Sequence, residues 1–401
     1  MNLNIPLYNE ETLKHNAAIN FHRPYRQCSI SVMDTIADPD IAFDNKGICN
    51  YFYEFQQKEK EYVLKGEEGK AKIKDIVTSI KASGNGKKYD CITGISGGVD
   101  STYVCLQAKK LGLRTLVVHF DNGWNSELAT ANIRNIIEKL GFDLYTLVVD
   151  WNEFKDLQLA YLKASVVDIE ALTDHAILGT LYKLAAEHNI KYILSGSNVV
   201  TEATLPKSWI FHKGDDINIK DIHKKFGTIQ LKTYPFYGLK EKKMYGGIKG
   251  IETINLLNYL EYNKKEVKKI IQDELNWRDY GGKHYESVFT RFYQGYILPV
   301  KFGIDKRKAH LSDLIFSGQI SKDEALEELK KHIIEEKQLN EDYDFVLKKL
   351  NLTQEEFENI LKLPRKEHTD FAITQSIFNE YPILQLARPF VSILRKIGLK
   401  V

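Results

Sequence analysis

Between residues 89 and 200, short apolar runs alternate with segments whose apolar positions recur every three to four residues. The apolar runs predict buried strands, and the periodic segments predict amphipathic helices that cover them. This alternation predicts an α/β fold, in which a parallel twisted sheet carries helices on both faces. We expect strands at residues 89–95, 114–120, 143–149 and 191–195, and helices at 102–111, 127–140, 153–163 and 174–188.

The flanking regions are less regular. Residues 56–82 are charged, with apolar positions at helical spacing, and predict a helix that leads into the sheet. Residues 254–260 suit a strand or a helix equally, whereas residues 264–275 and 321–362 have helical patterns. We therefore predict three parts: an N-terminal lobe with a linker helix (1–82), the α/β domain (83–260) and a helical C-terminal region (261–401).

The segment between the first predicted strand and the first predicted helix is Ser96-Gly97-Gly98-Val99-Asp100-Ser101. Because glycines lack Cβ, the backbone here can approach an anion closely, and the helix N-terminus supplies unpaired N–H groups. Ser96 and Ser101 add hydroxyl donors, and Asp100 can bind Mg²⁺ that bridges phosphate oxygens. The segment therefore predicts a loop that binds the phosphates of a nucleotide.

This loop differs from the Walker A loop, because no lysine follows its glycines. In a parallel sheet, ligands bind beyond the carboxyl ends of the strands, where two more predicted loops begin. We therefore expect further nucleotide contacts from residues that follow the second and fourth strands: Asp121, Gly123, Ser195, Gly196 and Asn198.

Composition excludes several classes of protein. The 401 residues carry a net charge of +2, from 56 basic and 54 acidic residues, which is too balanced to indicate a nucleic-acid partner. No apolar run approaches the roughly 20 residues of a membrane span, and the N-terminus lacks the features of a signal peptide. The four cysteines suggest no disulfide framework, so we expect a cytoplasmic protein without a membrane span.

Three further segments are distinctive: DTIADPDIAFD at residues 34–44, WRDYGGKHYES at 277–287 and KFGIDKRKAHLS at 301–312. Together with residues 96–101, which resemble the pyrophosphate loop of the N-type ATP pyrophosphatases, they resemble the N-acetyl sugar amidotransferases. That family acts in the biosynthesis of bacterial surface polysaccharides, such as the lipopolysaccharide O-antigen, and of nonulosonic acids. The resemblance spans about residues 28–335.

The resemblance implies a PP-loop fold, a reaction and its cofactors. ATP and Mg²⁺ would serve to adenylate the oxygen of an N-acetyl group on a sugar, and ammonia would then displace AMP to leave an acetamidino group. Because residue 2 is Asn and no cysteine lies in a glycine-flanked turn, we expect no glutaminase activity in this chain. The family pattern implies that a separate glutaminase and a cyclase-like channel subunit supply the ammonia.

Candidate residues of the reaction cluster in the later segments. Besides Asp100, we predict Lys283 as a group that neutralises the α-phosphate and His284 as a proton carrier. A structural hydrogen bond is the competing interpretation for each of these side chains. The candidates for substrate binding are ionisable residues from the same segments and from the end of the α/β domain: Glu202, Glu286, Arg291, Lys301, Asp305 and Arg307. Asp34 and Asp38 suit substrate binding or a turn equally.

The chain departs from the family at its N-terminal cysteines. The family often has two C-x-x-C pairs, spaced like a zinc knuckle, but here Cys28 is followed by Ser31 and Cys49 by Phe52. Two thiolates alone make an incomplete zinc site. We therefore do not expect zinc, and we predict that aromatic packing holds this lobe instead.

Two other functions remain open at this point. A tRNA-modifying PP-loop ATP pyrophosphatase would use the same loop, but it would need a basic face and often a catalytic cysteine pair. A non-catalytic nucleotide-binding module would retain the loop without turnover. The sequence leaves open which sugar is used, whether the sugar is linked to a nucleotide, and the oligomeric state.

Overall fold

The computed structural model describes residues 5–9, 11–14, 23–282 and 285–375. At its centre lies a five-stranded sheet with the order β3-β2-β1-β4-β5, and every neighbouring pair of strands is parallel. The strands are β1 (Cys91–Gly94), β2 (Thr115–Asp121), β3 (Asp143–Val148), β4 (Tyr192–Ser195) and β5 (Glu252–Asn255). The predicted α/β class with a parallel sheet is confirmed.

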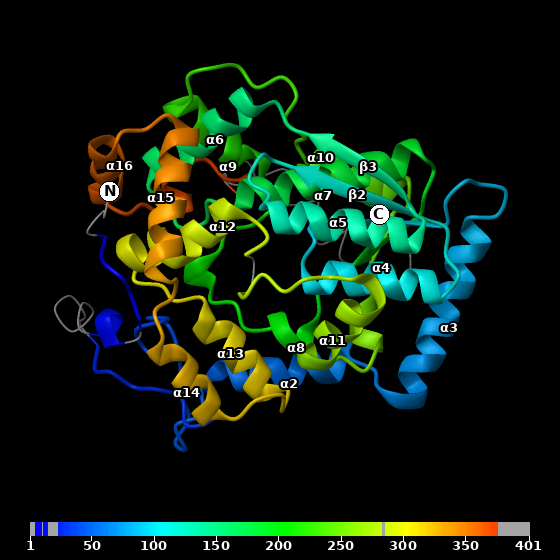
Figure 1. Cartoon of the computed structure of the whole chain (residues 1–401), viewed down its shortest axis with the longest axis horizontal. Helices are drawn as coiled ribbons and strands as arrows, with labels where there is room; N and C mark the ends of the chain where they lie inside the picture. Colours follow the sequence, from blue (N-terminus) through cyan, green and yellow to red (C-terminus); the bar gives the residue numbers. More distant parts are fainter. Residues whose placement is uncertain (1–4, 10, 15–22, 283–284, 376–401) are drawn as a thin grey trace.

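Helices flank the sheet on both faces and form the remainder of the molecule (Figure 1). Those before and within the sheet domain are α2 (Asn50–Tyr62), α3 (Gly66–Ser83), α4 (Val99–Lys110), α5 (Glu127–Leu140), α6 (Trp151–Ala164), α7 (Ala171–Glu187), α8 (Val199–Glu202), α9 (Asp216–Phe226) and α10 (Leu239–Lys242). Those that follow are α11 (Lys264–Leu275), α12 (Val288–Phe292), α13 (Arg307–Phe316), α14 (Lys322–Lys330), α15 (Glu336–Leu350) and α16 (Gln354–Lys362). Wider π-helical turns follow α10 (Lys243–Ile248) and α12 (Tyr293–Phe302).

The sheet separates two apolar cores, because successive side chains of a strand point to opposite faces. On one face, Cys91 and Val117 pack in a core that includes residues of α3, α4, α5 and α11. On the other face, Ile92 and Leu116 pack in a core with residues of α7. Burial raises the pKa of the Cys91 thiol to about 12, so this cysteine is a small core side chain, as predicted.

Three predicted elements differ from the structure. The third strand, β3, lies at the edge of the sheet, so most of its side chains are exposed rather than buried. The single helix expected at residues 56–82 is two helices, α2 and α3, which are separated at Val63 by extended backbone. The ambiguous segment 254–260 begins as the end of β5 and continues as a 3₁₀ helix (Leu256–Tyr259).

The N-terminal lobe packs against the C-terminal helix α13 and against the segment that precedes α9. A buried ion pair joins Asp34 of the lobe to Lys308 of α13, and the Trp209 indole donates to the Ala37 carbonyl at 2.7 Å. The largest apolar core contains residues from all three predicted parts of the chain. The boundaries between those parts stay a prediction. No helix within the described residues is long and apolar enough to cross a membrane.

Candidate nucleotide-binding site

The strand order creates a topological switch point between β1 and β4. From β1 the chain crosses to β2 on one side, whereas β4 lies on the other side of β1 and pairs with β5. The loops that leave the carboxyl ends of β1 and β4 therefore diverge, and ligands of open parallel sheets bind in the crevice between such loops. Both loops were predicted from the sequence to contact a nucleotide.

The loop after β1 has the geometry of an anion-binding turn. Gly97 has φ +81°, and a Cβ there would lie 2.9 Å from the Ala129 carbonyl oxygen, so only glycine fits. Gly98 is the N-cap of α4, and its N–H donates to Ser96 Oγ at 3.2 Å. Ser101 Oγ accepts from the Ser96 N–H at 3.3 Å and holds the turn from the helix side. The predicted glycines and hydroxyls thus form one compact turn at a helix N-terminus.

Asp100 lies in the first turn of α4, where Tyr262 donates its hydroxyl hydrogen to Asp100 Oδ1. Burial, and then the Asp100 carboxylate, raise the pKa of Tyr262, so the phenol stays protonated and acts as a donor. The exposed Glu202, at the end of α8, adds a smaller contribution to the same shift. The negative charges of Asp100 and Glu202 thus both raise the pKa of the buried Tyr262 phenol.

The loop after β4 closely approaches the loop after β1. A Cβ at Gly196 would lie 3.1 Å from the backbone carbon of Asp100, so glycine permits this contact. Ser195 Oγ accepts from the Ser197 N–H at 3.1 Å, and Asn198 caps α8 by accepting from the Thr201 N–H at 3.0 Å. The structure therefore brings Gly196 against the phosphate loop, whereas the Asn198 side chain is buried and used in capping.

The loop after β2 is held by Asp121 and by a histidine that the sequence analysis missed. Asp121 Oδ1 accepts from the Gly123 N–H at 2.8 Å and from Asn125 Nδ2 at 3.0 Å. The buried His119 bridges the two strand ends: Nδ1 lies 3.0 Å from the Ile95 carbonyl oxygen and Nε2 lies 3.0 Å from Asn125 Nδ2. A carbonyl can only accept, so Nδ1 carries the hydrogen. The one sequence signal was a histidine inside an apolar strand.

Three residues of the distinctive segment at 277–287 reach the phosphate loop: Trp277, Tyr280 and Glu286. The Trp277 indole donates to the Gly97 carbonyl at 2.8 Å. A Cβ at Gly98 would lie 3.1 Å from Glu286 Oε1 and 3.3 Å from the Tyr280 hydroxyl, so both side chains reach the loop. Lys283 and His284, the two other predicted catalytic residues, lie outside the described residues. Trp277, Tyr280 and Tyr262 were missed because spacing alone does not show which late aromatics return to an early loop.

The remaining predicted substrate residues are engaged within the C-terminal region. Arg291 forms a two-pronged ion pair with Asp342 of α15, at 2.6 and 2.7 Å. Arg307 binds its neighbour Asp305, at 2.8 Å in the shortest contact. Lys301 donates to three carbonyl oxygens around the end of α16, at 2.9 to 3.0 Å, and burial lowers its pKa to about 8. These contacts favour structural roles, and substrate binding by these four residues stays a prediction.

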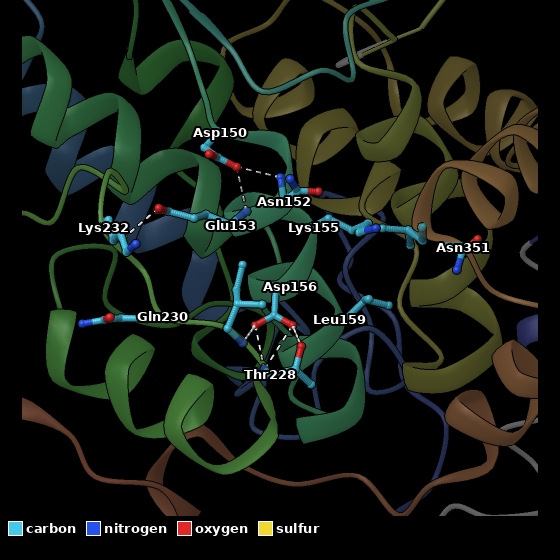
Figure 2. A pocket seen from close by; sticks show the side chains of 12 residues that line it. Asp150, Asn152, Glu153, Lys155, Asp156, Leu159, Thr228, Gln230, Lys232 and Asn351 are labelled. Atoms are coloured by element: carbon cyan, nitrogen blue, oxygen red, sulfur yellow. Dashed lines mark hydrogen bonds between the residues drawn. The ribbon is translucent and has the colours of Figure 1, made fainter.

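A polar groove of about 670 Å³ lies beyond the end of β3 (Figure 2). Two of its carboxylates are already used by the backbone. Asp156 accepts from Thr228, with the backbone N–H at 2.9 Å, and Glu153 accepts from the N–H groups of Lys232 and Thr233, at 2.9 Å each. None of the residues predicted for nucleotide or substrate lines this groove. The Asp156 and Glu153 carboxylates therefore hold the segment at residues 228–233 against α6.

The two N-terminal cysteines lie together in a buried position. Cys28 Sγ accepts from the Cys49 N–H at 3.3 Å, and Ser31 Oγ lies 3.9 Å from Cys49 Sγ. The hydrogen bond between the two sulfurs lowers the pKa of Cys28 and raises that of Cys49. No group of three or more His, Cys, Asp or Glu side chains suited to a metal occurs within the described part of the chain. Phe52 packs edge-on against Phe316, with ring centroids 5.5 Å apart.

Mg²⁺ typically takes one or two protein carboxylates and completes its shell with substrate phosphates and water. Asp100, at a helix N-terminus beside two serine hydroxyls, fits that donor set, and Glu202 is a second carboxylate of the same kind. Such a cation would neutralise phosphate charge. The residues present therefore suit magnesium bound together with a nucleotide better than magnesium bound to the protein alone.

Comparison with protein families divides the chain into two recognisable parts. Residues 90–182 match the model of the queuosine biosynthesis protein QueC. Residues 286–385 match the model of the C-terminal domain of WbpG-like lipopolysaccharide biosynthesis proteins. The first part, with its parallel sheet and its loop at the switch point, defines a PP-loop domain of the N-type ATP pyrophosphatase superfamily. The chain combines this domain with a WbpG-like C-terminal domain, so the superfamily expected from the sequence is confirmed, whereas membership of the N-acetyl sugar amidotransferases stays a prediction.

Similar solved structures are distant. The NMN synthetase of Francisella tularensis has 15% sequence identity and a TM-score of 0.30, covering 72% of this chain and 98% of its own. The NH₃-dependent NAD synthetase of Campylobacter jejuni, in complex with nitrate, has 15% identity and a TM-score of 0.28. It covers 52% of this chain and 86% of its own. A search of curated proteins returned no match.

Proposed function

We propose that this chain is an ATP-dependent amidotransferase acting on an N-acetylated sugar of a bacterial surface polysaccharide. The proposal depends chiefly on one observation: Trp277, Tyr280 and Glu286, which lie just before and at the start of the WbpG-like domain, reach the PP-loop turn at residues 96–101. The lipopolysaccharide context of that domain supports a sugar substrate.

The proposed reaction has two steps. The amide oxygen of the N-acetyl group attacks the α-phosphorus of ATP, and the α–β bridging bond breaks to release pyrophosphate. Ammonia then attacks the activated carbon, the carbon–oxygen bond breaks, and AMP leaves with the former amide oxygen. The turn at residues 96–101 would hold the pyrophosphate part of ATP by its N–H and hydroxyl donors, so its main contribution is positioning and charge stabilisation. Ammonia would come from a partner glutaminase through a cyclase-like subunit.

The QueC match supports a second candidate, a PP-loop pyrophosphatase that modifies a nucleoside or tRNA. The two candidates differ in the acceptor that pyrophosphate release requires. We expect the purified protein to release AMP, and to release pyrophosphate over many turnovers, only with ATP, Mg²⁺, ammonium and an N-acetylated sugar. Asp100→Asn should lower this rate by about 100-fold or more, because the pyrophosphate would be misplaced.

Three outcomes of this assay are informative. Release that depends on tRNA or a nucleoside instead of a sugar would favour the second candidate. Binding of ATP without release under any acceptor would indicate a non-catalytic module. Replacing ammonium with glutamine should give no product unless a glutaminase is added, and product from glutamine alone would contradict the proposed partner.

A further inference from the structure

Tyr262 reaches the phosphate loop from a distant part of the chain. It lies 162 residues beyond Asp100, between the 3₁₀ helix that follows β5 and α11, and its hydroxyl donates to Asp100 Oδ1. This residue lies outside the sequence motifs described above and outside the two stretches, 90–182 and 286–385, that match family models.

The tyrosine ring is fixed on several sides. Tyr262 is 8% exposed and belongs to the core beneath α4, and its ring packs edge-on against Tyr103 with centroids 6.1 Å apart. The backbone of Gly196, in the loop after β4, lies so close to Asp100 that a Cβ there would be 3.1 Å from the Asp100 backbone carbon. The Asp100 carboxylate is therefore held by a rigid phenol and confined by a close backbone contact.

We propose that Tyr262 is a positioning residue, which orients the Asp100 carboxylate toward the Mg²⁺ and pyrophosphate of bound ATP; this inference rests on the proposed function. A neutral donor fixes the rotamer of a carboxylate without cancelling its charge. Removing a group that hydrogen-bonds a metal-binding carboxylate without contacting the metal typically weakens metal affinity by about 10–100-fold.

The test is the binding of Mn²⁺, as a spectroscopic substitute for Mg²⁺, together with the non-cleavable analogue α,β-methylene-ATP. Tyr262→Phe removes only the donor, so we expect Mn²⁺ affinity, titrated by electron paramagnetic resonance, to fall by about 10–100-fold. The Mg²⁺ concentration needed for half-maximal AMP formation should rise in parallel. The melting temperature, measured for each variant, should change much less.

Tyr103→Phe is the matched control, because it removes a neighbouring hydroxyl that is hydrogen-bonded to Gln107. The affinity of this variant for Mn²⁺ should equal that of the unmodified protein. A double variant, Tyr262→Phe with Asp100→Asn, should bind Mn²⁺ no more weakly than Asp100→Asn alone, because Tyr262 acts through Asp100.

The outcomes separate this inference from the proposed function. If Tyr262→Phe titrates Mn²⁺ normally while Asp100→Asn is impaired, the positioning role is overturned and the proposed function stands. Additive effects in the double variant would also overturn the positioning role. If Asp100→Asn retains both Mn²⁺ binding and AMP formation, the proposed function itself is overturned.

Discussion

At the scale of single residues, His368 shows how burial determines protonation. Its Nε2 accepts from the Asp168 N–H at 3.4 Å, so its Nδ1 must carry the hydrogen and donate to Asn218 Oδ1 at 2.8 Å. The ring also stacks on Phe211, with centroids 4.4 Å apart. Burial lowers the pKa of His368 to about 4, because the charged imidazolium would lose its solvation by water.

This shift predicts how stability depends on pH. The folded pKa of about 4 lies below the ordinary value of 6.5, so the unfolded state binds more protons between these values. The free energy of unfolding should therefore fall as pH decreases from 6.5 to 4, with His368 contributing about 3 kcal/mol. Denaturant titrations across this range would measure the effect. His368→Gln removes the titrating group and should flatten this part of the profile; an unchanged slope would contradict the assignment.

At the scale of elements, two glycines with positive φ lie on either side of β1 and differ in their surroundings. Gly97 combines a positive φ with a backbone oxygen 2.9 Å from the position of a Cβ, so a side chain there is both strained and obstructed. Gly86, in the connection before β1, has a similar φ of +74° but open space around it. Alanine substitutions at these two glycines therefore separate the free-energy cost of a left-handed conformation from the free-energy cost of the close contact.

We expect Gly86→Ala to lower the free energy of unfolding by about 1–2 kcal/mol, the usual cost of a left-handed conformation. Gly97→Ala should cost more, because the loop must also move away from α5. It should further reduce AMP formation by about 100-fold, since the bound phosphates would be displaced. Chemical denaturation and the pyrophosphate assay would measure the two effects. Equal stability losses with full activity in Gly97→Ala would contradict the close contact.

At the scale of the whole molecule, one lysine joins the WbpG-like domain to the sheet. Lys349, in the last turn of α15, donates to the Gly123 carbonyl in the loop after β2. Its ammonium lies 4.8 Å from the ring centroid of Trp151 and 4.9 Å from that of Trp124. Because α15 lies far from β2 in the sequence, this contact couples the C-terminal helices to the loops at the carboxyl edge of the sheet (Figure 1).

Lys349→Met should therefore lower the free energy of unfolding by about 2 kcal/mol, through loss of the cation–π contacts and the hydrogen bond. Lys348→Met, at the adjacent exposed position of the same helix, is the matched control and should change stability by less than about 0.5 kcal/mol. Thermal and chemical unfolding of both variants would measure the difference. Similar values for the two variants would show that this contact contributes little.

The sequence by itself determined the elements that depend on local pattern. Helices at residues 127–140 and 264–275 were predicted at their observed bounds, because apolar periodicity, a capping residue and a helix-ending residue in the left-handed conformation act locally. The phosphate loop was also predictable, since its glycines and hydroxyls are adjacent in the chain. The exposure of β3 was not, because the order of strands in a sheet is not encoded in any one strand.

Only the tertiary structure decided which distant side chains meet at the loop. Tyr262 and Trp277 lie more than 160 residues beyond it, and their contacts arise from how the C-terminal half folds back. Arg291 and Lys301 had the charge expected of ligand-binding groups, but the structure gives each of them partners within the protein. The type of a residue shows which interactions its side chain can make, whereas the packing of the folded chain decides which partner it interacts with.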